Sequence, residues 1–257
     1  EGEASLETYN VLHLTTENKE VVESKTGPFT FGLDPSDNKF PYTKIKKIVF
    51  ESDFTPITTA KLFGYTEDKS FTNLTDIVNI DKLDTKETTD MKYMYAYLKN
   101  ITSIDLSKID TTNVIDMQSM FIGCEAITSL DLSKFNTGNA SDMTSMFKGC
   151  KNLSALDLSK FDTSKVESFK EMFSSCSNLT SINLSSFNIV KATTTYSMFL
   201  NCVKLKTLDI TSFKTSDTSL DISNMFKGCS ELVTIKTTSD FKKEKLSGTD
   251  VFTDSLK

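Results

Sequence analysis

Aspartates recur along this chain at a spacing that could place carboxylates side by side. Asp105, Asp131 and Asp157 are 26 residues apart, and each is followed two residues later by a serine. Carboxylates about 5 Å apart are the arrangement found in retaining glycosidases, and carboxylate and hydroxyl oxygens are ligands for Ca²⁺. The complete set, which we call the strand-face row, is Asn79, Asp105, Asp131, Asp157, Asn183 and Asp209, with Ser107, Ser133 and Ser159.

Nothing in the pattern distinguishes one aspartate of the strand-face row from the next. A glycosidase needs two carboxylates in different environments, so that one is the acid and the other the base. A calcium site needs oxygens that converge, whereas a ladder spreads them. The chain has one histidine, His13, and no arginine, which removes most catalytic triads and phosphate clamps. We therefore expect no catalytic residues, no metal and no cofactor, and the row is either a solvated strand face or a partner surface.

An internal repeat of 26 residues sets the elements that would position this row. Five cysteines occupy one position of the repeat, with steps of 26, 26, 26 and 27 residues, and a Met-Phe pair precedes each of them. Self-similarity at this period indicates a solenoid of stacked units with a continuous core. Leu98 stands at the same position in the first full unit, so the position is apolar. We expect buried free thiols there, although neighbouring rungs are close enough for a disulfide. The cysteines are Cys124, Cys150, Cys176, Cys202 and Cys229.

Each unit divides into two halves with different periodicities. The first half reads Leu-x-x-Leu-x-Leu, as in the unit from Leu153, and its alternation predicts a short strand with one buried face. In the second half, Met143, Met146, Phe147 and Cys150 follow the i, i+3, i+4, i+7 spacing of a helix. Aspartate, serine or threonine precedes that stripe and could cap the helix. Stacked units would form a parallel sheet on a concave face, with short helices on the other face.

The two ends of the chain depart from the repeat, as capping units do. We expect an irregular, β-rich N-terminal cap over residues 1–42, with a strand at Val11–Leu14, and a capping repeat with a charged insert over 43–74. Six repeats of 26 or 27 residues then cover 75–231, and a C-terminal capping repeat covers 232–257.

Three tyrosines, Tyr93, Tyr95 and Tyr97, cluster in the first full unit. Tyr95 matches the phenylalanine of the Met-Phe pair and is expected in the core. Tyr93 and Tyr97 either pack against the capping repeat or form an exposed aromatic patch of the kind enriched at interfaces.

Composition excludes several classes of function. The net charge is −6 and all 29 cationic residues are lysines, which is unlike the arginine-bearing basic face of nucleic-acid-binding proteins. No apolar run is long enough to span a membrane. The chain opens at Glu1, as a mature exported protein does once its signal peptide is removed.

The motif Leu-x-x-Leu-Asp-Leu-Ser-x-Phe-x-Thr-Ser-x-Val, ending Met-Phe-x-x-Cys, resembles the BspA-like leucine-rich-repeat surface proteins of bacteria and some protists. It is clearest from Leu153 to Val166 and Met172 to Cys176, and the resemblance covers residues 75–257. The resemblance implies an α/β leucine-rich-repeat solenoid at a bacterial cell surface that binds host or matrix proteins or glycans. We expect it to be monomeric, without nucleic acid as a partner. A structural spacer with no specific ligand is the alternative.

Overall fold

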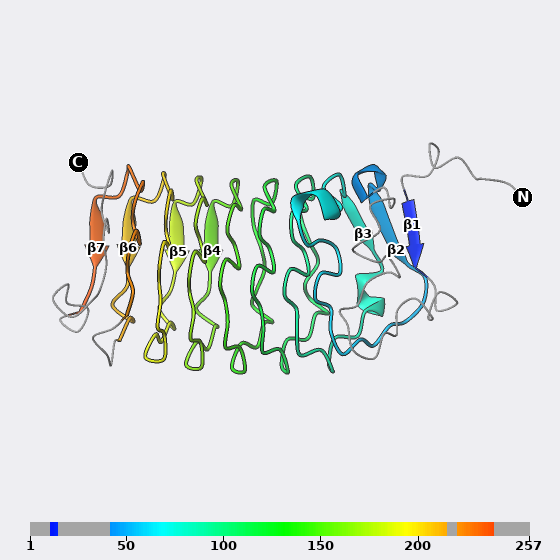
Figure 1. The fold of residues 1–257 in the computed structure, drawn as a ribbon, viewed down its shortest axis with the longest axis horizontal. Coiled ribbons are helices and arrows are strands. Elements are labelled where there is room, and N and C mark those ends of the chain that lie inside the picture. The colour runs from blue at the N-terminus through cyan, green and yellow to red at the C-terminus, as the bar shows by residue number, and fades with distance from the viewer. Residues whose placement is uncertain (1–10, 15–41, 215–219, 239–257) are drawn as a thin grey trace, which may run out of the picture.

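The computed structural model describes residues 11–14, 42–214 and 220–238, and these form a row of stacked rungs (Figure 1). The strands are short, and paired strands are parallel. β1 (Val11–Leu14), β2 (Lys47–Phe50) and β3 (Asp76–Val78) form one sheet, β4 (Ala155–Asp157) pairs with β5 (Ser181–Asn183), and β6 (Thr207–Asp209) pairs with β7 (Thr234–Lys236). The predicted strand at Val11–Leu14 and the parallel pairing of strands are thereby confirmed.

Predictions for residues 1–10, 15–41 and 239–257 lie outside the described residues. They include most of the N-terminal cap and the end of the C-terminal capping repeat. The extra residue of the unit from Leu205 falls near 215–219, which is also outside. The domain boundaries therefore stay predictions.

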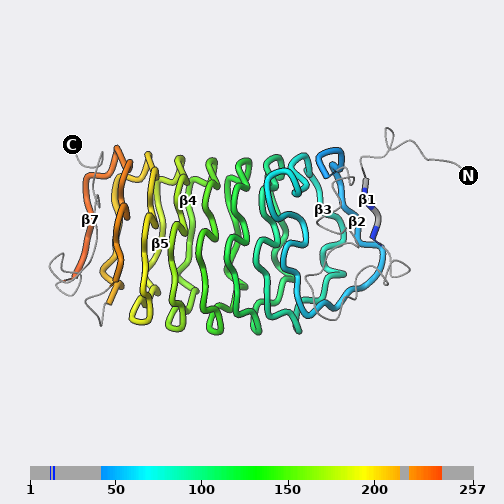
Figure 2. Tube along the Cα trace, in the orientation of Figure 1, coloured from blue at the N-terminus to red at the C-terminus, as the bar shows by residue number. Residues whose placement is uncertain are grey.

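A second line of parallel pairing joins the rungs at the residues expected to cap helices. Single bridges connect Asp90 to Asp116, Asp116 to Asp142, and so on through Ser168 and Thr194 to Asp221. Thr58 is bridged to Asp90, so the capping repeat continues the same line. Each rung is thus bridged to its neighbour at the equivalent position from residue 58 to residue 221. Figure 2 shows the trace of these rungs side by side.

The helix predicted for the second half of each unit is absent, and this part of the expected α/β class is wrong. The described residues contain three short 3-10 segments, η2 (Tyr42–Lys44), η3 (Glu67–Lys69) and η4 (Ile80–Lys82), and no α-helix. Instead, alternate amides reach the next rung: Met117 N–H donates to the Asp142 carbonyl at 3.1 Å. The amides between them close tight turns, as Cys124 N–H does to the Phe121 carbonyl at 3.2 Å. Amides that bond across rungs cannot form the i to i−4 bonds of a helix.

These turns need left-handed backbone at two positions of each unit, four residues apart. Left-handed φ costs an L-residue other than glycine about 1–2 kcal/mol, so the neighbouring rungs must hold the conformation. The first position holds Lys61, Tyr93, Ser119, Ser145, Glu171, Ser197 and Asn224, and the second holds Tyr97, Gly123, Gly149, Ser175, Asn201 and Gly228.

The core is built from columns of identical side chains. The ring of Tyr95 stacks on Phe63 and on Phe121, each with centroids 5.3 Å apart, and the column continues to Phe226. All five cysteines are buried and free, and each thiol donates to the carbonyl of the aromatic residue one rung back, as Cys150 does to Phe121 at 3.2 Å. Leu98 is fully buried at the equivalent position. The apolar cysteine position and the core position of Tyr95 are confirmed.

A third column consists of buried threonines that follow the bulky apolar anchor of each unit. Thr163 is fully buried; its hydroxyl donates to the carbonyl of Asn188 at 2.9 Å and accepts from the Asn188 amide at 2.8 Å. Thr111 bonds Asn136 in the same way. Ile189 replaces the threonine in the next unit and is buried without such a bond. The threonine hydroxyls therefore hydrogen-bond neighbouring rungs in the part of each unit that has neither a strand nor a β-bridge.

Candidate functional site

The aspartates of the strand-face row lie on one exposed face, at successive rungs. Asp157, Asn183 and Asp209 are the last residues of β4, β5 and β6, and all three are exposed. Asp105 and Asp131 are exposed at the equivalent positions. Asn79, after β3, is exposed as well, but its amide donates to the carbonyl of Phe50 at 3.1 Å and is tied to the preceding rung. The predicted residues from 105 to 209 are therefore brought into one line.

Each member of this line closes a turn with the residue two positions later. The Oδ1 atom of Asp105 accepts the Ser107 amide at 2.9 Å, and the same bond joins Asp131 to Ser133 and Asp157 to Ser159 at 3.0 Å. Hydrogen bonds from the backbone and side chain of these serines lower the pKa of all three carboxyls. A side-chain hydrogen bond from Asn183 also lowers the pKa of Asp157. The three carboxylates are consequently charged at neutral pH.

The arrangement gives no asymmetric pair of carboxyls on this face. Asp209 has the same turn with Thr211, and its pKa is lowered too. An acid and base pair would need one carboxyl with a raised pKa beside one with a lowered pKa. The strand-face row offers repeated, equivalent anionic groups, which suit binding rather than proton transfer.

Lysines border the strand-face row at its C-terminal end and along one side. Lys236 stands where the other units have aspartate or asparagine, and its ammonium lies 3.9 Å from Oδ2 of Asp209. Lys108, Lys134 and Lys160 are exposed beside the row. The C-terminal end of the row is thus neutralised within the chain, whereas Asp105, Asp131 and Asp157 form no salt bridge with a described residue.

The two rungs that carry Asp105 and Asp131 lack strand pairing at the strand face. No strand is assigned to 103–105 or 129–131, and no ladder joins them to each other or to β3 and β4. The difference lies in the backbone rather than in side-chain burial, because Ile182 in β5 is half-buried, as Ile104 and Leu130 are. Peptide groups next to these two aspartates are therefore available to water or to a ligand.

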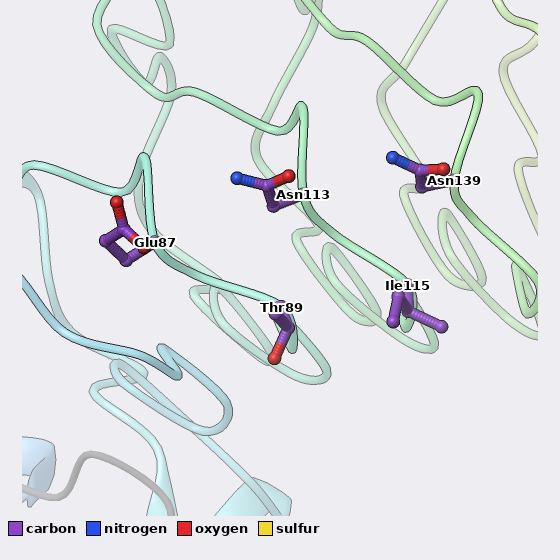
Figure 3. A pocket seen from close by; sticks show the side chains of 5 residues that line it. All are labelled: Glu87, Thr89, Asn113, Ile115 and Asn139. Carbon is purple, nitrogen blue, oxygen red and sulfur yellow. The ribbon is translucent and has the colours of Figure 1, made fainter.

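A hollow that the sequence reasoning missed lies at a corner of the rungs. It is lined by Glu87, Asn113 and Asn139 on one row and by Thr89 and Ile115 on another (Figure 3). Ile115 is 51% exposed. The signal in the sequence was an isoleucine at a repeat position that holds Ser141, Glu167 and Thr193 in the next three units. None of the predicted site residues lines this hollow.

Comparison with known proteins identifies one family. The family described as "Mycoplasma protein of unknown function, DUF285" matches residues 66–156 and 128–241. No curated protein matches the sequence. None of the described segments forms a helix long and apolar enough to cross a membrane.

Two solved structures are similar to parts of the chain. One is a leucine rich cell surface protein from Faecalibacterium prausnitzii A2-165, with 15% identity over 79% of this chain and 75% of that chain and a TM-score of 0.29. The other is a leucine-rich repeat protein from Bacteroides ovatus ATCC 8483, with 15% identity over 82% of this chain and 64% of that chain and a TM-score of 0.33. This chain thus spans less than two thirds of the second protein.

Proposed function

The chain belongs to the family described as "Mycoplasma protein of unknown function, DUF285", and we propose that it is a non-enzymatic binding protein displayed at a cell surface. Its ligands are host or matrix proteins or glycans, and the strand-face row is its binding surface. It acts as a monomer without a cofactor.

The observation that carries this proposal is the contrast between the strand-face row and the other repeated polar positions. Thr163 and its equivalents are buried and bond neighbouring rungs. Asp142 and its equivalents are half-buried at the bridges between rungs. The strand-face carboxylates are exposed and use one oxygen for their own turn. A line of fixed, charged carboxylates attracts a partner that presents ammonium groups or hydroxyls in a line.

A structural spacer is the second candidate, and the turn bonds favour it. Asp157 and Asn183 make the same bond to the following serine, so turn closure alone accounts for either residue. A spacer would need no exposed charge at these positions.

Binding to an array of host matrix proteins and glycans separates the two candidates. The test variant changes Asp105, Asp131, Asp157 and Asp209 to Asn, which keeps the turn bonds, as Asn183 shows. The control variant changes Glu87, Asp110, Asp162 and Glu167 to the corresponding amides; these residues are exposed outside the row and carry the same total charge.

We expect saturable binding that is lost in the test variant and retained in the control. Binding that survives in the test variant would place the ligand elsewhere on the molecule. No binding by the unmodified chain would favour the spacer.

A further inference from the structure

A cluster of tyrosines lies at the junction of the capping repeat and the first full unit. The tyrosine cluster consists of Tyr65, Tyr93 and Tyr97. The rings of Tyr65 and Tyr93 meet edge to face, with centroids 5.5 Å apart. Tyr65 is 38% exposed, and Tyr93 and Tyr97 are half-buried. We propose that this cluster binds a neutral, hydroxyl-rich oligosaccharide, at a surface separate from the strand-face row.

The backbone of the cluster indicates that these tyrosines are not merely a cap. Tyr93 and Tyr97 have φ of 58° and 57°, and they are the aromatic residues among the left-handed positions of the described chain. Later units place serine, glutamate, asparagine or glycine there. The fold requires left-handed backbone at these positions in every unit, so what distinguishes this unit is the bulk of its two side chains. Capping of the core does not need them, because Tyr95 already stacks on Phe63 of the capping repeat.

Gly123, on the next rung, lies against Tyr97, and Gly149 lies against Gly123. The ring of Tyr97 lies against Gly123, where an added Cβ would be 2.6 Å from Cδ1 of Tyr97. At Gly149, one rung further, the nearest atom to an added Cβ is 3.5 Å away. Gly123 is buried, so the side of Tyr97 that lies against it is covered, and the ligand contacts the exposed side of the ring.

Positively and negatively charged side chains surround the tyrosine cluster, and they form ion pairs with one another. Lys99 forms ion pairs with Glu67 and Glu125, and Lys151 lies 3.0 Å from Glu125. The ammonium of Lys61 lies 3.8 Å from the ring centroid of Tyr65. A charged polymer would have to disrupt these pairs. Sugar hydroxyls both donate and accept hydrogen bonds, so they match carboxylates and ammonium groups together.

The tyrosine hydroxyls add donors and acceptors of their own. Those of Tyr65, Tyr93 and Tyr97 make no hydrogen bond with a described residue. Tyrosine combines an apolar ring with a polar tip, which suits a ligand with apolar ring faces and polar edges. The chemistry of the cluster therefore favours a neutral sugar chain.

The test uses the full chain and two neutral probes, maltohexaose and cellohexaose, in titration calorimetry. Tyr93→Ser and Tyr97→Gly introduce residues that later units carry at these positions. Tyr97→Phe keeps the ring. Tyr196→Ser is the matched control, because Tyr196 is a half-buried tyrosine with a lysine, Lys170, 5.5 Å from its ring. Thermal unfolding of every variant is measured in parallel.

We expect at least one probe to bind, with affinity reduced tenfold or more in Tyr93→Ser and Tyr97→Gly and retained in Tyr97→Phe and Tyr196→Ser. The melting temperature of Tyr97→Gly should equal or exceed that of the unmodified chain. Absence of binding to both probes, unchanged affinity in the two variants, or a melting temperature lowered together with binding would each overturn the proposal. Binding confined to charged glycans or to proteins would also overturn it. None of these results bears on the strand-face row.

Discussion

Replacing Thr163 with valine should weaken the attachment between two rungs without leaving a cavity. Valine has the shape of threonine but no hydroxyl, so the change removes both hydrogen bonds to Asn188, at 2.8 and 2.9 Å. A net contribution of about 0.5–1.5 kcal/mol for each bond gives about 1–3 kcal/mol. Asn188 is half-exposed, so water can re-pair part of its backbone. We expect a loss of about 2 kcal/mol in the free energy of unfolding.

Urea unfolding followed by circular dichroism and by tyrosine fluorescence measures this loss. Coincidence of the two transitions establishes that a single free energy describes them. Thr163→Ser is the control, since serine keeps the hydroxyl and loses one methyl group, which corresponds to about 0.8 kcal/mol of buried surface. A loss below about 0.5 kcal/mol for Thr163→Val would show that the threonine column contributes packing alone, and the reasoning would be refuted.

Four further results follow from the structure. Gly149→Ala should cost about 1–2 kcal/mol from left-handed φ alone, whereas Gly123→Ala should cost more because its Cβ meets Tyr97 at 2.6 Å; equal losses in urea unfolding would contradict this. Burial raises the pKa of every cysteine thiol, to about 11 at Cys229, so a thiol reagent at pH 8 should label the chain only when it unfolds. Because burial raises these pKa values above the ordinary thiol value of 9.0, the free energy of unfolding should fall as pH rises above 9. Hydrogen exchange should be faster at Leu130, in the open part of the strand face, than at Leu156 in β4; similar rates would show that a ladder forms there.

The repeat predicted the inside of the molecule well because burial follows directly from periodicity. Cys150 and Phe147 recur with one spacing, and any regular winding of 26 residues places them in the same column. Periodicity could not distinguish a helix from the turns that replace it. The i, i+3, i+4, i+7 spacing points one set of side chains inward in a helix and in a series of tight turns alike, so the predicted helix was wrong. Gly123 and Gly149 were the available signal, since both have left-handed φ.

The strand-face row could be placed from sequence, but its environment could not. Alternation along β4 was enough to put Asp157 outside. The turn bond between Asp157 and Ser159 is local, whereas the missing ladder at 103–105 and 129–131 depends on how far apart neighbouring rungs lie. That separation is a tertiary property without a local sequence code. The hollow at Ile115 depends likewise on three successive rungs.

Because the contact between neighbouring rungs is uniform, the number of rungs can change without a change in how they pack. Cys150, Cys176 and Cys202 each donate to a carbonyl at the same place on the preceding rung, so any central unit meets its neighbours in the same way. Removing or duplicating one unit would recreate the contact it interrupts, and would change the reach of the molecule by about 4.8 Å. Gene segments of 26 codons can therefore be gained or lost without a new interface having to evolve, and the two ends alone would need to stay fixed.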